Sequence, residues 1–344
     1  MDPGVIMKFL IAGFGSIGRR HLRNLRALGE SDILLYRTHK STLTDEEIDG
    51  LVVESDIGAA LSHKPDGVII SNPTALHMDV AIPAARAGCS ILLEKPIAQN
   101  LERIDEFEDA LIQGHARVLV GFQFRFHPSL QYIRRLFKTG GLGRPVSVRA
   151  HWGEYLPAWH PWEDYRQSYS ARSDLGGGAA LTLCHPFDYL RWLVGEVESV
   201  WGYAGHLGDL EIDVEDTAEI GLKFVNGAVG SIHLDYLQRP PIHRFEIICT
   251  EGTIEWNNSS GAVRIFRAST DSWESFLAPV GFDRNDLFMA EMRNFLDILR
   301  GEEQPRCTLQ DGIEAIRLVE AFYQAAKSGG RVALDHFAYR GGKA

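Results

Sequence analysis

The first third of the chain alternates short apolar runs with longer segments in which apolar residues recur at helical spacing. The segment 17–28 shows this spacing in Leu22, Leu25 and Leu28, and a second helical segment covers 76–87. The short runs, typical of buried strands, lie at 8–12, 33–36, 66–71, 90–94 and 118–121. Strands that alternate with helices of about ten residues indicate a parallel sheet covered on both faces. We therefore expect an α/β domain over residues 1–122.

From about residue 145 the pattern changes to β-rich segments joined by short glycine turns. These segments lie at 146–152, 218–224, 228–235, 245–250 and 253–257. Two amphipathic helices follow, and their apolar faces contain Phe288, Met292, Phe295 and Leu299 in one and Ile313, Ile316, Val319 and Tyr323 in the other. This order predicts an α+β domain with a mostly antiparallel open sheet over residues 123–344.

The composition disfavours several classes of protein, among them nucleic-acid-binding, disulfide-rich and membrane proteins. The 344 residues suit two domains, and the formal net charge of −11, with 46 acidic and 35 basic residues, disfavours nucleic acid as a partner. The four cysteines are scattered, so we expect neither disulfides nor a metal site. The start of the chain lacks the basic region of a signal peptide, and no apolar run approaches the roughly 18 residues that span a bilayer. A cytoplasmic protein without membrane attachment is the expectation.

A glycine-rich turn follows the first predicted strand and precedes the first predicted helix. The turn contains Gly13, Phe14, Gly15, Ser16, Ile17 and Gly18. In a strand–turn–helix context this GxGxxG spacing is typical of a Rossmann fold, because the glycines allow the turn, the approach of a pyrophosphate and close helix packing. The helix N-terminus offers free N–H groups to the phosphates. A glycine turn that binds nothing is the alternative.

The end of the second strand bears on the choice of coenzyme. An NAD site commonly has Asp or Glu here, but the chain has Tyr36, Arg37 and Thr38, with no acid until Asp45. Arg37 lies nineteen residues after Gly18 and is suited to a 2′-phosphate. NADP is therefore favoured over NAD, unless Arg37 is simply a solvated arginine.

Two further segments follow predicted strands and are expected to line the ligand crevice at their carboxyl ends. The candidate coenzyme-binding residues here are Asn72, Pro73, Thr74 and His77 in one segment and Glu94 and Lys95 in the other. An ammonium at Lys95 would polarise a carbonyl or lower the pKa of an alcohol, and Glu94 would orient it. A surface lysine at the start of a loop is the alternative.

Four motifs occur in a characteristic order along the chain: GFGSIGRRH, NPTALH, EKPIAQN and GFQFRFHP, with EGTIEW further on. This ordered set resembles the glucose–fructose oxidoreductase, inositol dehydrogenase and rhizopine-catabolism family, written Gfo/Idh/MocA, over essentially the whole chain. The resemblance implies an NAD(P)-dependent oxidoreductase of sugars, polyols or their derivatives, some of them nucleotide-linked. It also implies a homodimer or homotetramer, with Lys95 and His185 as the catalytic residues.

One position departs from the family pattern. Many members have an Asp four residues before the histidine, where this chain has Leu181. His185 remains the candidate for proton exchange, because an imidazole titrates near neutral pH. Asp188, one helical turn further on, would orient the ring or serve a structural role. The alternative for His185 is a core histidine with a satisfied hydrogen bond.

Two segments supply candidate substrate contacts. In GFQFRFHP, Gln123 and Arg125 alternate with phenylalanines as on a strand, which places both on one face, Gln123 toward the coenzyme and Arg125 toward an oxygen-rich ligand. A salt bridge between domains is the alternative for Arg125. The loop over 152–169 is rich in aromatic residues, and we expect Tyr155, Trp162 and Tyr169 to bind the substrate together with Lys95 and His185. Inward packing of these rings is the alternative.

The sequence thus predicts hydride transfer between a nicotinamide and a carbinol or carbonyl carbon of a carbohydrate-like substrate. Two other functions fit the same family. One is a glycosidase that recycles a tightly held coenzyme, and the other is a non-enzymatic NAD(P)-binding regulator, which the missing acid at Leu181 favours.

Overall fold

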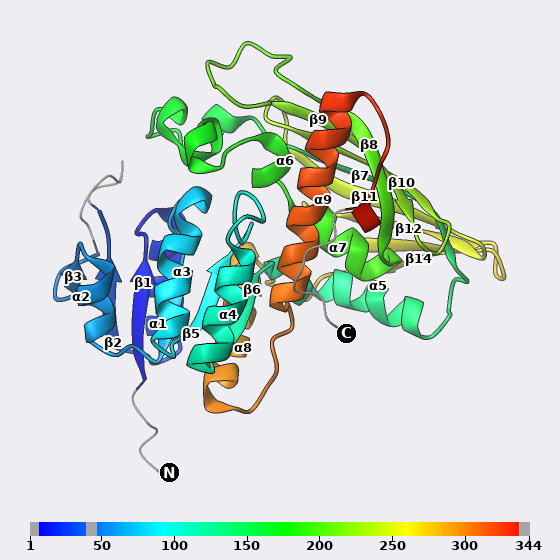
Figure 1. The fold of residues 1–344 in the computed structure, drawn as a ribbon. Coiled ribbons are helices and arrows are strands. Elements are labelled where there is room, and N and C mark those ends of the chain that lie inside the picture. Colours follow the sequence, from blue (N-terminus) through cyan, green and yellow to red (C-terminus); the bar gives the residue numbers. More distant parts are fainter. Residues whose placement is uncertain (1–6, 39–46, 337–344) are drawn as a thin grey trace. The chain divides into compact units, whose positions relative to one another are not determined.

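The computed structural model describes residues 7–38 and 47–336, which form two compact units (Figure 1). The first unit contains the described residues up to Gln123 and returns for Arg284–Ile313. The second contains Phe124–Asp283 and the described residues from Glu314 onwards. The units are therefore not two consecutive stretches of the chain. None of the helices in the described ranges is long and apolar enough to cross a membrane.

The first unit is built on a six-stranded parallel sheet in the order β3-β2-β1-β4-β5-β6. The strands are β1 (Lys8–Ala12), β2 (Asp32–Tyr36), β3 (Val52–Glu54), β4 (Gly67–Ile70), β5 (Ser90–Glu94) and β6 (Val118–Gly121). Strands β4 and β6 are buried along their whole length, because helices cover both faces of the sheet. The predicted α/β domain with five strands is confirmed, and β3 is the additional edge strand.

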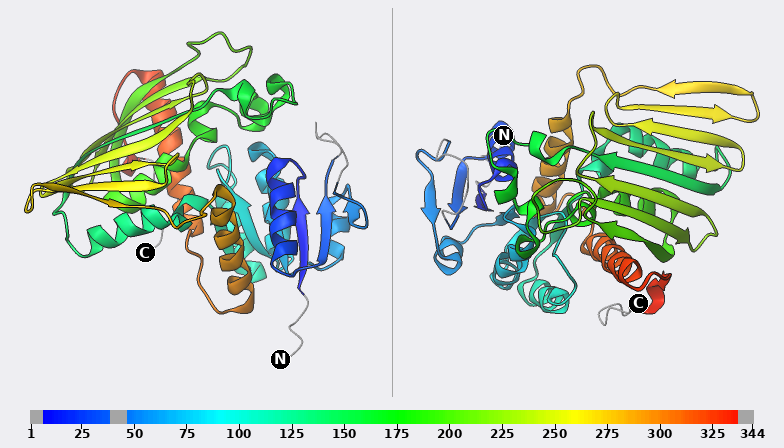
Figure 2. Two further views of the ribbon diagram at one scale, coloured as in Figure 1. Left: turned by 180° about the vertical axis from the view of Figure 1, so that it is seen from behind. Right: turned by 90° about the horizontal axis from the view of Figure 1, so that it is seen from above.

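Helices lie on both faces of this sheet. They are α1 (Ser16–Ala27), α2 (Ile57–Ser62), the short 3₁₀ turn η1 (Thr74–Leu76), α3 (His77–Arg86), α4 (Ile104–Gly114) and α8 (Arg284–Arg300). Helix α1 packs beside α8, and α3 packs between α2 and α4 on the opposite face (Figure 2). The buried face of α8 includes Phe288, Met292 and Phe295, as its spacing predicts.

The second unit is built on a nine-stranded sheet in the order β14-β13-β12-β11-β7-β10-β9-β8-β15. Its strands are β7 (Pro145–Gly153), β8 (Val197–Gly205), β9 (Thr217–Phe224), β10 (Val229–Asp235), β11 (Ile242–Cys249), β12 (Gly252–Asn257), β13 (Ala262–Arg267), β14 (Ser272–Phe276) and β15 (Val332–Ala333). Among the described residues β7 and β10 form the one parallel pair, and the other neighbours are antiparallel. The predicted mostly antiparallel sheet is confirmed.

One face of this sheet is covered and the other is open. Helices α5 (Pro128–Lys138), α7 (His185–Val194) and α9 (Leu309–Ser328) lie on the same side of the strands (Figures 1 and 2). Along β7, Val148, Ala150 and Trp152 are buried, whereas Arg149 is exposed and His151 half-buried. Side chains alternate between the faces of a strand, so the second set belongs to the open face.

The segment between β7 and α7 contains the predicted aromatic loop. It is organised as short helical turns: η3 (Leu156–Ala158), η4 (Tyr165–Gln167), η5 (Tyr169–Ala171), η6 (Ser173–Leu175) and α6 (Ala179–Thr182). Tyr236 is fully buried, and its hydroxyl donates to the Ser170 carbonyl at 3.2 Å. This bond joins the end of the loop to the sheet.

The GFQFRFHP segment is not a strand, and this part of the sequence interpretation was wrong. Residues Gln123–Phe126 form a 3₁₀ helix, η2, and α5 starts at Pro128 with the His127 ring accepting the Ser129 N–H at 3.1 Å. A 3₁₀ helix has three residues per turn, so Gln123 and Arg125 do not share a face as they would on a strand. Phe124 packs edge-on against His185 and His243, at ring-centroid distances of 4.8 and 4.9 Å. This aromatic packing accounts for the phenylalanine spacing.

Candidate active site

The glycine turn between β1 and α1 has a shape that larger residues would destroy. Gly13 has φ +89°, and a Cβ there would lie 2.5 Å from the Asn72 nitrogen. A Cβ at Gly18 would lie 2.2 Å from the Gly13 carbonyl oxygen. A Cβ at Gly15, in contrast, meets no atom within 4 Å. The turn is thus packed closely at Gly13 and Gly18 and open at Gly15, which leaves room there for a ligand.

The N-terminus of α1 suits a phosphate. Gly15 occupies the N-cap position and has no side chain to accept the N–H groups of the first turn, which begins with Ser16, Ile17 and Gly18. That turn also contains no acidic residue. Phe14 is buried, and the Arg19 guanidinium lies 4.7 Å from the centre of its ring. Free N–H groups and the positive end of the helix dipole therefore face the open side of the turn, and these residues fit the pyrophosphate of a dinucleotide.

The end of β2 places Arg37 directly after the sheet. Its side chain is buried, and its backbone N–H donates to the carbonyl of Glu54 at 3.0 Å. Asp45 lies outside the described residues. Glu54 is an acidic residue near this strand end that the sequence did not indicate. It pairs with Tyr36 in the register of β2 and β3, and its carboxylate lies 2.9 Å from the His63 ring nitrogen. Strand β3 places Glu54 beside the end of β2. This strand is too short, with too few apolar residues, to be predicted from the sequence.

The segments after β4 and β5 are tied together by His77. Its Nε2 lies 3.0 Å from the Asn72 carbonyl and its Nδ1 lies 3.2 Å from the Ile97 carbonyl. The ring is fully buried, and burial lowers its pKa despite these two carbonyls. His77 thereby fixes the loop that contains Asn72, Pro73 and Thr74 against the one that follows Lys95.

Glu94 ends β5 and positions the backbone of Lys95. One carboxylate oxygen of Glu94 lies 2.8 Å from Nε2 of the buried His21, and the other accepts the Lys95 N–H at 3.3 Å. Gly121, on the neighbouring strand β6, leaves room for this carboxylate, because a Cβ there would lie 3.1 Å from it. Lys95 itself is half-buried.

A second acid that sequence reasoning missed lies beside this pair. Glu291 of α8 is fully buried, and neither of its carboxylate oxygens has a hydrogen-bond partner among residues 7–38 and 47–336. Burial, and then the charge of Glu94, raise the pKa of Glu291 well above its usual value. The Glu291 carboxyl therefore stays neutral to a higher pH than an exposed glutamate does. The sequence feature that could have indicated Glu291 is its position within the apolar face of the amphipathic helix α8.

In the second unit His185 opens α7 and is buried among aromatic rings. It stacks on Trp152 at a ring-centroid distance of 5.4 Å and meets the edge of Phe124. Leu181 lies in α6, one turn before, and is buried, so no carboxylate occupies that position.

Asp188 forms a buried ion pair with Arg125. The guanidinium donates to both carboxylate oxygens, with Nη2–Oδ1 at 2.6 Å and Nε–Oδ2 at 3.0 Å. Both residues belong to the second unit, so the salt bridge expected as an alternative for Arg125 exists within one unit. The charge of Arg125 is neutralised, which leaves it suited to hydrogen bonding rather than to binding an anion by net charge.

The aromatic residues of the loop differ in exposure. Trp162 is exposed, Tyr155 and Tyr169 are half-buried, and the Arg239 guanidinium lies 4.0 Å from the centre of the Tyr155 ring. Exposed or half-buried rings with adjacent donors fit a hydroxylated ligand. Inward packing of all three side chains does not occur.

A Rossmann unit with an open glycine turn is typical of dinucleotide-binding proteins. The model of the oxidoreductase family with an NAD-binding Rossmann fold matches residues 7–122, and the model of the GFO/IDH/MocA C-terminal domain matches residues 130–255. The chain belongs to the Gfo/Idh/MocA family of oxidoreductases.

Similar proteins span the whole chain. The uncharacterised oxidoreductase YrbE of Bacillus subtilis is 28% identical over 95% of this chain and 96% of its own length. Myo-inositol 2-dehydrogenase of Thermotoga maritima is 26% identical, with 94% and 96% covered. The crystal structure of the WlbA dehydrogenase from Bordetella pertussis in complex with NADH and UDP-GlcNAcA is 25% identical, with 96% and 98% covered and a TM-score of 0.80. The likeness therefore extends over both units.

Proposed function

We propose that this oxidoreductase transfers hydride between a nicotinamide coenzyme and a carbinol or carbonyl carbon of a sugar, polyol or sugar derivative, including nucleotide-linked ones. The open glycine turn at the N-terminus of α1 is the observation that carries the proposal, because it fits a pyrophosphate and excludes a side chain at Gly13 and Gly18. The names of the relatives, a myo-inositol 2-dehydrogenase and a dehydrogenase crystallised with UDP-GlcNAcA, support the substrate class.

The coenzyme would be held by three groups of residues in the first unit and at its end. The glycine turn would bind the pyrophosphate, and Arg37 would bind the adenosine ribose. The rest of the coenzyme would be held by the loops that contain Asn72, Pro73, Thr74, His77, Glu94, Lys95 and Gln123. Bound there, the nicotinamide supplies or accepts the hydride. NADP is proposed over NAD because Arg37 follows β2, where an NAD-selective site has an acid.

Two residues of this chain would serve the reacting oxygen. Lys95 would stabilise negative charge on that oxygen with its ammonium group, and Glu94 fixes the Lys95 backbone. His185 would exchange the proton, because an imidazole can both accept and donate one. Its ring stacks on Trp152, and Leu181 stands where many family members have a carboxylate. Arg125, Tyr155, Trp162 and Tyr169 would contact the substrate hydroxyls and the C–H faces of its ring.

We propose a cytoplasmic homodimer or homotetramer, and size-exclusion chromatography with light scattering tests the assembly.

A panel of free and nucleotide-linked sugars and polyols, tested with both coenzymes, examines the proposed function. Net formation or loss of reduced coenzyme, read at the nicotinamide absorbance, is the expected result. Substrate conversion without net change in the coenzyme would instead show a coenzyme-recycling glycosidase. Coenzyme binding without any conversion across the panel would favour a regulator.

A further inference from the structure

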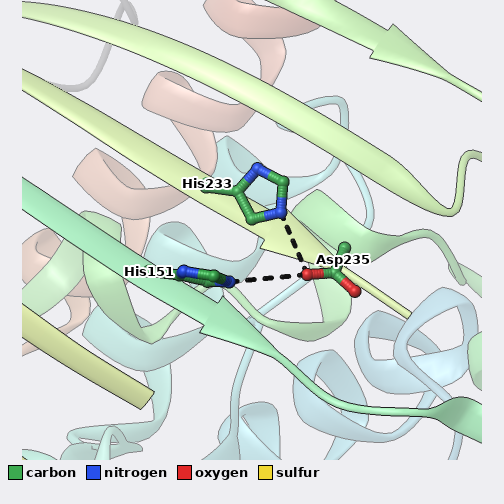
Figure 3. Close-up of side chains that lie close together, drawn as sticks. All are labelled: His151, His233 and Asp235. Carbon is green, nitrogen blue, oxygen red and sulfur yellow. Dashed lines mark hydrogen bonds and ion pairs between the residues drawn. The ribbon is translucent and has the colours of Figure 1, made fainter. Parts of the chain in front are cut away.

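Three metal-ligating side chains meet on the open face of the second unit's sheet (Figure 3). His151 of β7 and His233 of β10 are partners in the parallel register, and Asp235 follows two residues after His233. The alternation along β7 places His151 on the face opposite Trp152, which stacks on His185. The cluster therefore lies apart from the candidate active site.

The three ligand atoms are spaced as around a small metal ion. Nε2 of His233 lies 3.0 Å from Oδ2 of Asp235, and Nε2 of His151 lies 3.7 Å from the same oxygen. All three atoms lie within 4.8 Å of one another. With zinc–ligand bonds of 2.0–2.1 Å, a tetrahedral site separates its ligands by about 3.3 Å. Small rotations of these side chains suffice to surround one ion.

Nε2 of His151 is buried and makes no hydrogen bond within the described part of the chain. It lies at ion-pair distance from Asp235, 3.7 Å, which is longer than a hydrogen bond. A buried imidazole nitrogen without a partner is costly, and a metal ion or a proton shared across the cluster relieves that cost.

The surrounding residues hold two of the ligands in orientation. Glu219 of β9 binds Nδ1 of His233, an arrangement that fixes the ring of a metal-ligating histidine. Oδ1 of Asp235 accepts the N–H groups of Leu237 and Gln238, which leaves Oδ2 directed at the imidazoles. A Cβ at Gly153, the register partner of Asp235, would lie 2.1 Å from Oδ2, so only glycine leaves space for this carboxylate.

We propose that His151, His233 and Asp235 bind a divalent transition-metal ion, with zinc as the expected occupant. Two imidazoles and one carboxylate suit zinc and its neighbours, whereas magnesium and calcium prefer all-oxygen ligand sets. The His151 and His233 side chains are 27% and 31% exposed, so water would be available to complete the coordination of a bound ion.

The bound ion would join β7 to the end of β10, where Asp235 accepts the N–H groups of the following turn. The Glu154 N–H, just beyond β7, donates to the Asp235 carbonyl at 3.1 Å, and the aromatic loop begins immediately afterwards. The site is therefore assigned a structural role, in which the metal stabilises the base of the loop.

Calorimetric titration of the chelator-treated full chain with Zn²⁺ tests the proposal. We expect one ion per chain, with affinity reduced at least tenfold in His151→Ala and in Asp235→Asn, and unchanged in His206→Ala. His206 is the matched control, because it is half-exposed in the same unit and also lies near an aspartate, at 3.9 Å from Asp216. Absence of stoichiometric binding by the wild-type chain at micromolar Zn²⁺ overturns the proposal. Unchanged Zn²⁺ affinity in both His151→Ala and Asp235→Asn would also overturn the proposal. Thermal melting confirms that the two variants are folded.

Discussion

Arg125 and Asp188 form a two-point ion pair inside the second unit, with side-chain exposures of 5% and 1%. Its geometry fixes the 3₁₀ turn η2 against helix α7, which begins with His185. The Arg125 guanidinium also lies 5.3 Å from the centre of the Trp192 ring, a further residue of α7.

Removing one partner of this pair should destabilise the second unit strongly. Asp188→Ala leaves the Arg125 charge buried without its carboxylate, and we expect a loss of about 3–5 kcal/mol in the free energy of unfolding. Urea unfolding followed by fluorescence measures it. The double variant Arg125→Met, Asp188→Leu should recover most of the loss, because it removes the buried charge as well. A stable Asp188→Ala single variant would show that the pair contributes little.

Lys95→Met should separate coenzyme binding from turnover. We expect coenzyme affinity to be largely retained and kcat to fall by a factor on the order of 10² or more, because the ammonium that stabilises the reacting oxygen is lost. Steady-state kinetics and fluorescence titration give the two quantities. Lys64→Met, at an exposed lysine of the same unit, is the control and should behave as wild type. Near-normal turnover of Lys95→Met would remove Lys95 from the mechanism.

Glu291→Gln should stabilise the protein in a pH-dependent way. The pKa of Glu291 is raised on folding, so the unfolded chain ionises first and the folded state loses stability as the pH rises above the usual carboxyl range. A neutral amide avoids this loss. We expect a higher melting temperature than wild type at pH 8 and a difference that shrinks toward pH 4. A pH-independent difference would show that Glu291 is ionised in the folded protein.

The sequence predicted the two sheets and the glycine turn because strong local patterns specify them. Buried parallel strands read as apolar runs, and Gly13 and Gly18 are dictated by the close backbone contacts of the turn. The strand assigned to Gln123 and Arg125 failed, because alternating phenylalanines also suit a 3₁₀ turn in an aromatic cluster. Hydrophobic spacing alone does not distinguish the two.

The residues that the sequence did not reveal depend on long-range pairing. Glu291 meets Glu94 only because α8 returns to the first sheet, and an amphipathic helix does not indicate which sheet it packs on. Similarly, His151 and His233 lie 82 positions apart in the sequence and become neighbours through the parallel pairing of β7 and β10. No motif with a fixed spacing in the sequence predicts such a pair.

Arg37→Ala tests the preference between the coenzymes. Charge-assisted hydrogen bonds contribute about 1.5–3 kcal/mol, and each 1.4 kcal/mol is tenfold in affinity. We expect the wild-type chain to bind NADP(H) at least about tenfold more tightly than NAD(H), and the variant to lose most of that preference. Dissociation constants for both coenzymes measure this. Equal wild-type affinities would contradict the assignment of Arg37 to the 2′-phosphate.

Transfer of deuterium from the coenzyme to the substrate distinguishes hydride transfer to carbon from the other reactions considered. Reduced coenzyme deuterated at C4 of the nicotinamide is supplied with the oxidised form of the substrate found in the sugar and polyol panel, and the product is examined by mass spectrometry and NMR. Hydride transfer should place one deuterium on the new carbinol carbon, at a rate strongly reduced in Lys95→Met. A product without deuterium, or label that returns to the coenzyme while a glycosidic bond is cleaved, would contradict it.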